Sequence, residues 1–348
     1  MPALPFPQVQ GNSGGTAVTG SEQERKADLV LDAGGVKGIG LVGAVLTLVD
    51  AGYSFPRIAG TSAGAVVASL VAAYQKAGRD LHELVEVMNT LDYSRFADRS
   101  IAQRIGGRLG VGLDLLVRDG MHTGDYLVDW LGPELEKVGV TTFSHLAIDD
   151  PDGSLADYQS YSLVVHVSDL SRQVLVRLPW DYDRYGRDAG AARIVDAVRA
   201  SMSIPFYFKP VQVDTGNGTA TWADGGLLAD FPITAFDRTD GRQPRWPTWG
   251  VKLSGEPTVT RDKPVRNALG LAFRCLATLR GDWNRYHLDS EGVNRRTIYV
   301  DTTGVSPVDF ALDRETRDRL FANGQAAARK FLSSSSGESG LSDHQGSY

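Results

Sequence analysis

At residues 57–70 the sequence reads Arg57-Ile58-Ala59-Gly60-Thr61-Ser62-Ala63-Gly64-Ala65-Val66-Val67-Ala68-Ser69-Leu70. A short apolar run from Phe55 to Ala59 precedes the serine, and a long apolar run compatible with a helix follows it. A Gly-x-Ser-x-Gly pattern between a strand and a helix is typical of a nucleophile elbow, a turn too tight for side chains beside the serine. We therefore predict that Ser62 is a nucleophile at a helix N-terminus and that Gly60 and Gly64 allow its turn.

Another strand and helix precede this elbow. Residues 27–32 form a short apolar segment, and apolar residues at helical spacing then run from Ile39 to Val49. Gly52 follows as a favourable C-cap. The order strand, helix, strand, helix predicts a βαβ unit with two parallel strands.

The loop between the first strand and its helix is rich in glycine and reads Ala33-Gly34-Gly35-Val36-Lys37-Gly38. It lies at the same edge of the sheet as the elbow, and its uncovered N–H groups attract negative charge at a helix N-terminus. A dinucleotide-binding turn has similar glycines, but it requires an acidic residue at the end of the second strand. That strand here ends at Gly60-Thr61-Ser62, which favours an oxyanion loop.

Strands and helices alternate to the end of the chain, which predicts one α/β domain over residues 27–332. We expect a three-layer α/β/α sandwich around a central, mostly parallel mixed sheet. Residues 1–26 and 333–348 are polar and are expected to be a disordered leader and a disordered tail. Further strands are expected at 161–169, 173–178, 211–213, 219–222, 248–253 and 297–301, and further helices at 81–91, 124–138, 194–201, 269–279 and 315–331.

Composition and charge exclude several classes of protein. The 348 residues are 42% hydrophobic and 22% charged, which is ordinary for a globular domain, and the net charge of -6 argues against a nucleic-acid partner. Cys275 is the single cysteine, so there is no disulfide framework and no cysteine-based metal site. Residues 1–20 lack the features of a signal peptide, and the uncharged run Ile58–Gln75 contains the elbow glycines, so a cytoplasmic protein is expected.

The sequence offers two candidates for the base that activates Ser62. An α/β-hydrolase places its catalytic histidine late in the chain, where His287 has the most suitable position; His166 lies in a strand-like run and is expected to be structural. Alternatively, Asp224 ends a short strand before Gly225 and accepts the serine proton directly. Asp-Gly-Gly is also a common turn, so the residues alone leave both bases open.

Taken together, three motifs resemble those of the patatin-like phospholipases. They are the glycine loop at 33–38, Gly-x-Ser-x-Gly at 60–64, and Asp-Gly-Gly 162 residues beyond the serine, at 224–226. The segments 200–210 and 227–232 also resemble the family's flanks of the aspartate. The resemblance covers about residues 27–332.

This resemblance implies roles for particular residues. Ser62 becomes the nucleophile and Asp224 the general base of a dyad without histidine, and the oxyanion hole is formed by Gly34, Gly35 and Val36. The supporting motif residues are Lys37, Gly38, Gly60, Gly64, Gly225 and Gly226.

The resemblance also implies a function. The expected protein is a serine lipid acyl hydrolase of the phospholipase A or lysophospholipase type, which works through an acyl-enzyme without metal or other cofactor. Its partner is a phospholipid or another acyl-ester lipid, reached through transient contact with a membrane surface.

Two positions of the glycine loop depart from the family pattern. Ala33 stands where the family usually has its first glycine, so this position must keep an ordinary backbone conformation. Lys37 replaces a frequent arginine; it keeps the positive charge but cannot make bidentate contact with a phosphate.

Two other functions remain open, a catalytically silent lipid-binding protein on the same fold and a general carboxylesterase with a Ser-Asp-His triad that includes His287. The aromatic stretch Ile204–Phe208 would line an acyl-chain site, approach a membrane or pack in the core. Residues 80–160, with glycines at 106–112, suggest a lid.

Overall fold

The computed structural model describes residues 25–96, 122–150, 153, 155–205, 207–253, 291–307 and 309–342. Its strands are β1 (Arg25–Lys26), β2 (Asp28–Leu31), β3 (Tyr53–Ser54), β4 (Ile58–Thr61), β5 (Leu163–Asp169), β6 (Val174–Leu178), β7 (Val211–Asp214), β8 (Thr219–Asp224), β9 (Thr248–Lys252) and β10 (Thr297–Tyr299). Its α-helices are α1 (Gly38–Asp50), α2 (Ala63–Lys76), α3 (Glu83–Asn89), α6 (Asp125–Lys137), α7 (Ile194–Ser201), α9 (Glu291–Asn294) and α10 (Arg314–Ser342).

The main sheet is mixed and mostly parallel, as predicted. Its pairing follows the order β10-β9-β2-β4-β5-β8-β7, and β6 also pairs with β5. The strands from β10 to β5 are parallel, whereas β6 and β8 run antiparallel to β5, and β7 runs antiparallel to β8. The predicted βαβ unit is β2, α1, β4 and α2, in which Leu31 pairs with Gly60. The loops after β2 and β4 therefore leave the sheet at the same edge.

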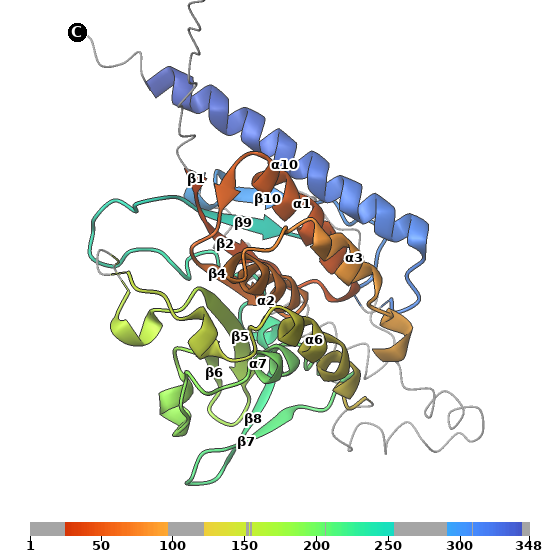
Figure 1. Cartoon of the computed structure of the whole chain (residues 1–348), viewed down its shortest axis with the longest axis vertical. Helices are drawn as coiled ribbons and strands as arrows, with labels where there is room; N and C mark the ends of the chain where they lie inside the picture. Colours follow the sequence, from red (N-terminus) through yellow and green to blue (C-terminus); the bar gives the residue numbers. More distant parts are fainter. Residues whose placement is uncertain are drawn as a thin grey trace, which may run out of the picture.

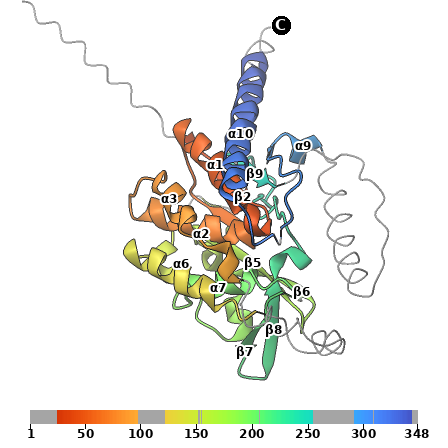
Figure 2. The same cartoon turned by 90° about the vertical axis from the view of Figure 1, so that its right-hand side faces the viewer.

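One face of the sheet is covered by helices. Figures 1 and 2 show α1, α2, α3, α6 and α7 on this side, with α10 lying along α1. The α1–α10 contact depends on glycine, because a Cβ atom on Gly43 would lie 2.2 Å from the Phe321 carbonyl oxygen and one on Gly324 would lie 2.1 Å from that of Gly40. Any larger residue at these positions would force the two helices apart.

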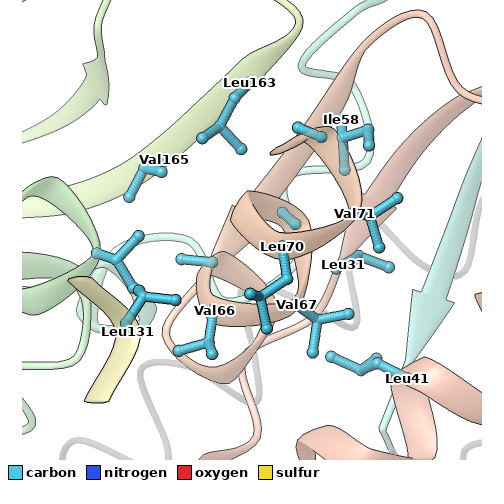
Figure 3. Close-up of a cluster of buried hydrophobic side chains, with 14 of the residues drawn as sticks. Leu31, Leu41, Ile58, Val66, Val67, Leu70, Val71, Leu131, Leu163 and Val165 are labelled. Atoms are coloured by element: carbon cyan, nitrogen blue, oxygen red, sulfur yellow. The ribbon is translucent and has the colours of Figure 1, made fainter. Parts of the chain in front are cut away.

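Helix α2 lies at the centre of the core and is buried from Ala63 to Tyr74. Figure 3 shows Val66, Val67, Leu70 and Val71 pointing in different directions from this helix, toward side chains of the neighbouring strands and of α1 and α6. The long uncharged run is therefore a buried helix, as predicted. Within the described ranges, no helix combines the length and apolar character needed to cross a membrane.

The opposite face of the sheet packs on a second cluster. Val30, Ala59 and Val164 come from three adjacent strands and lie in one cluster with Trp180 and Phe236. In the described part of the chain this layer consists mainly of the connections after β6 and β8. The helix expected at 269–279, with Cys275, lies outside the described residues, as do His287 and the glycine-rich part of the expected lid.

Most predicted elements are present with small shifts, and α7 has the predicted limits. The C-terminal helix is longer than predicted, since α10 continues beyond residue 332 to Ser342. Its serines are compatible with a helix because the hydroxyls of Ser333 and Ser334 donate to the carbonyls of Lys330 and Phe331. At the other end, β1 begins two residues before the predicted start of the domain. The disordered leader and tail stay predictions for residues 1–24 and 343–348, outside the described ranges.

Candidate active site

Ser62 lies between β4 and α2 with φ 55° and ψ −121°, a conformation that a residue with a side chain rarely adopts. Such backbone strain costs about 1–3 kcal/mol and occurs most often at functional sites. The glycines beside the serine are required sterically, because a Cβ atom on Gly60 would lie 2.3 Å from the Gly64 carbonyl oxygen, and one on Gly64 would lie 2.3 Å from that of Leu31. The predicted elbow geometry is confirmed.

The sheet brings the end of β8 to this elbow. Val165 and His166 of β5 pair with both β4 and β6, whereas residues 167–169 pair with both β6 and β8. Strands β4 and β8 must therefore share one edge of β5 and approach each other from opposite directions. Thr61 pairs with His166, and Asp224 pairs with the next residue of β5. Ser62 and Asp224 meet where the two strands end.

The Ser62 hydroxyl donates a hydrogen bond to Oδ2 of Asp224 at 2.7 Å. The other carboxylate oxygen, Oδ1, accepts the N–H group of Gly226 at 2.7 Å, in the short helix η6 (Gly225–Leu227). Gly225 is required for close approach, because a Cβ atom there would lie 2.3 Å from the His166 carbonyl oxygen. A carboxylate in this position is correctly placed to accept the serine proton.

Ser201, the last residue of α7, fixes the backbone of Ser62. Its hydroxyl accepts the Ser62 N–H group at 2.8 Å and donates to the His166 carbonyl at 2.7 Å. The side chain is fully buried. Sequence reasoning missed this residue, although it lies in the segment that resembles the family, because only the fold brings the end of α7 to the elbow.

His166 is buried in β5 beneath the elbow. Burial lowers the pKa of this imidazole to about 4, and a hydrogen bond with the Gly60 backbone opposes the shift. The side chain is therefore neutral at physiological pH. This agrees with the structural role predicted for it.

The glycine loop lies beside the elbow, as predicted, and begins the short helix η1 (Gly35–Lys37) ahead of α1. Gly35 has φ +58°, so it needs its glycine, whereas Gly34 is extended with φ −166°. Among the described residues, neither N–H group donates to a carbonyl. The N–H group of Val36, in contrast, donates to the Pro307 carbonyl at 3.0 Å. Val36 is thus not available to a substrate oxygen in this conformation, contrary to its predicted role.

The remaining loop positions have structural roles. The Lys37 ammonium group points into the protein and donates to the Leu253 carbonyl and to Oγ1 of Thr302, so it holds the loop rather than facing a substrate. Ala33 has an ordinary backbone conformation, as predicted, since Ser62 and Gln173 are the non-glycine residues with positive φ in the described ranges. Gly38 is not sterically required, because the nearest contact of a Cβ atom there would be an ordinary 3.6 Å.

A buried acid lies directly before the glycine loop. Burial raises the pKa of Asp32 to about 6, although the nearby Lys252 ammonium group favours its charged form. Its Oδ2 accepts the Leu253 N–H group, and its Oδ1 lies 3.7 Å from Nζ of Lys252. This acid therefore ties the start of the loop to the end of β9.

An apolar pocket begins at the elbow and extends between α2, α6 and the segment after α7. Ala63, Val66, Met202, Ile204 and Phe208 contribute to its wall. Phe208 is buried and Ile204 is partly buried, which agrees with core packing or an acyl-site lining and not with an exposed membrane contact. In the described part of the chain, no three histidine, cysteine or acidic side chains gather to form a metal site.

The family model described as patatin-like phospholipase matches residues 29–237, which include the elbow, the glycine loop and Asp224. The chain belongs to the patatin-like phospholipase family. The uncharacterized protein YqhO of Bacillus subtilis (strain 168) is 31% identical over 305 residues, which are 88% of this chain and 97% of that protein. Family membership supports the general class of lipid acyl hydrolase for this patatin-like chain.

The fold is also similar to that of a solved structure. VipD from Legionella pneumophila superposes with a TM-score of 0.50 and 20% identity, covering 89% of this chain and 67% of that one. ExoU from Pseudomonas aeruginosa, solved in complex with SpcU, gives a TM-score of 0.48 and 17% identity. That match covers 89% of this chain but 52% of the other one. At these identities the likeness concerns the fold alone.

Proposed function

We propose that this patatin-like protein hydrolyses fatty-acyl esters of phospholipids or lysophospholipids through a dyad of Ser62 and Asp224. The observation that carries the proposal is the 2.7 Å hydrogen bond from the serine hydroxyl to a carboxylate oxygen at the end of a neighbouring strand. The strained serine backbone and the adjacent glycine loop support the same chemistry. The apolar pocket at the elbow supports an acyl chain as the group recognised.

The mechanism follows from these positions. Oδ2 of Asp224 accepts the hydroxyl proton while Oγ of Ser62 attacks the ester carbonyl carbon, and the N–H groups of Gly34 and Gly35 donate to the developing oxyanion. Collapse of this intermediate breaks the bond to the alcohol oxygen, which takes the proton from Asp224, and leaves an acyl-enzyme. Water then attacks the acyl-enzyme, with Asp224 again accepting a proton. The fatty acid leaves, and the serine hydroxyl is restored.

The test is hydrolysis of p-nitrophenyl butyrate and of phospholipid vesicles by the wild type, Ser62→Ala and Asp224→Asn. Each variant should lose activity by about a thousandfold or more, since the members of such a catalytic unit act together. Ser69→Ala is a matched control, because Ser69 is also a buried serine but lies within α2, where its hydroxyl donates to the Val66 carbonyl of its own helix. This control should retain full activity.

Two further measurements separate the alternative functions. A catalytically silent lipid-binding protein would leave Ser62 unlabelled by a fluorophosphonate probe, whereas the proposed hydrolase should react stoichiometrically. A Ser-Asp-His esterase would lose turnover on His287→Ala, whereas the dyad predicts that this variant remains active. Retained turnover in both Ser62→Ala and Asp224→Asn would rule out the dyad.

A further inference from the structure

The carbonyl group of Pro307 covers the glycine loop. It accepts the Val36 N–H group at 3.0 Å, and a Cβ atom on Gly35 would lie only 1.8 Å from its oxygen. An ester substrate presents the same kind of group to an oxyanion loop, a carbonyl oxygen directed at backbone N–H groups. Pro307 therefore lies against the loop where a substrate oxygen would have to approach.

Three residues further along the chain, Phe310 fills the apolar pocket. Its ring packs against the rings of Phe96 and Phe208, with centroid distances of 6.1 and 6.2 Å, and against that of Tyr207 at 6.1 Å. The cavity that remains between Phe310, Ala63 and the other lining residues has a volume of about 20 Å³. This volume holds about one water molecule, whereas ligand pockets enclose about 300–1,000 Å³. Ser62, next to the pocket residue Ala63, is only 2% exposed.

A second cavity, larger and lined mainly by polar residues such as Asn89, Asp92 and Arg317, also has Phe310 in its wall. Its volume is about 390 Å³, and it shares Leu91, Tyr93 and Phe310 with the walls of the first cavity. Phe310 itself is only partly buried and is held mainly by aromatic contacts, each of which contributes modestly beyond burial. The ring therefore has space beside it, into which it can turn and leave its place in the apolar pocket to an acyl chain.

We propose that Phe310, together with Pro307, closes the active site against long acyl chains and so determines which chain lengths are hydrolysed. A short acyl group needs little space beyond Ser62 and is accepted with the ring in place. A long chain must displace the ring before its methylene groups can be buried, and each buried methylene otherwise strengthens binding about fourfold. This inference rests on the proposed function of Ser62.

The test is the ratio of kcat/KM for p-nitrophenyl laurate to that for p-nitrophenyl butyrate, with both substrates in monomeric solution. Phe310→Ala should raise this ratio about tenfold over the wild type, because it frees the space that the ring occupies in the apolar pocket. Phe310→Trp should lower the ratio, because it enlarges the obstruction. Phe331→Ala is the matched control, since that ring packs on Trp249 and lines neither cavity, and it should leave the ratio unchanged.

The outcomes are distinguishable. If the Phe310 variants hydrolyse butyrate but keep the wild-type ratio, the role of Phe310 is wrong and the proposed function stands. If no protein hydrolyses either ester and Ser62 does not react with a fluorophosphonate, the proposed function fails and this inference fails with it. The two Phe310 substitutions are expected to move the ratio in opposite directions, which a general loss of stability would not do.

Discussion

The two halves of the candidate active site are built differently. The elbow half, Ser62 with Asp224, is formed by strand ends that meet along β5, and its hydrogen bonds are already in place. The loop half, residues 33–38, depends on distant segments after β9 and β10, and one of its N–H groups is occupied by Pro307. The Ser62–Asp224 pair is thus preorganised, whereas the glycine loop is covered by the Pro307 carbonyl.

The largest difference between the halves should appear when one glycine of each is replaced by alanine. Gly64→Ala places a Cβ atom 2.3 Å from a backbone oxygen of β2, so we expect loss of soluble protein or at least a thousandfold loss of esterase activity. Gly38→Ala meets only ordinary contacts and should remain within a few-fold of wild type. Activity and thermal unfolding of the two variants measure the contrast, and equal behaviour would show that the elbow has more freedom than its geometry implies.

A second difference between the halves is electrostatic. The folded-state pKa of His166, in the elbow half, is lowered to about 4, so the unfolded chain takes up its proton first and stability is lost as pH falls from 6.5 to about 4. The folded-state pKa of Asp32, before the loop, is raised to about 6, so its contribution to stability decreases as pH rises from 3.8 to about 6. Each effect reaches about 3 kcal/mol, and the two have opposite signs over nearly the same pH range.

His166→Gln should therefore expose the Asp32 contribution. In the wild type the two contributions should nearly cancel, so these two groups should change the free energy of unfolding little between pH 4 and 6. The variant lacks the histidine contribution and should become less stable by about 3 kcal/mol as pH rises over this range. Urea unfolding at several pH values measures this difference. Parallel profiles for the two proteins would mean that His166 keeps an ordinary pKa in the fold.

The elbow half was also the more predictable from sequence. Gly60, Ser62 and Gly64 are neighbours in the chain, so their conformational requirements can be read from one local pattern, and the adjacent glycine loop follows from the parallel βαβ unit. The pairing of Ser62 with Asp224 depended on resemblance, because nothing local indicates that β8 approaches β4 end to end along β5.

The contacts of the loop half were not predictable in the same way. Pro307 and Phe310 reach the site only because β10 adds to the far edge of the sheet beside β9 and the chain then returns across the loop. Val36 was assigned as a donor because the motif alone cannot report a competing carbonyl more than two hundred residues away. Local sequence patterns specify backbone conformation well. Whether a backbone N–H group already has an acceptor, however, depends on how distant parts of the chain fold together.

The smallest predicted effect concerns Ser201, which belongs to the elbow half although α7 supplies it. Ser201→Ala leaves the Ser62 N–H group buried without its acceptor, a loss of about 1–3 kcal/mol that should lower kcat by about tenfold to a hundredfold while KM changes little. Ser203→Ala is the matched control: its hydroxyl bonds to Arg199 rather than to the elbow, and the carbonyl that accepts the Asp224 N–H group is retained. A rise in KM with unchanged kcat in Ser201→Ala would instead place Ser201 in substrate binding. A fall in kcat alone would show that the Ser201 hydroxyl, which links the elbow to β5, holds the strained serine in register with Asp224.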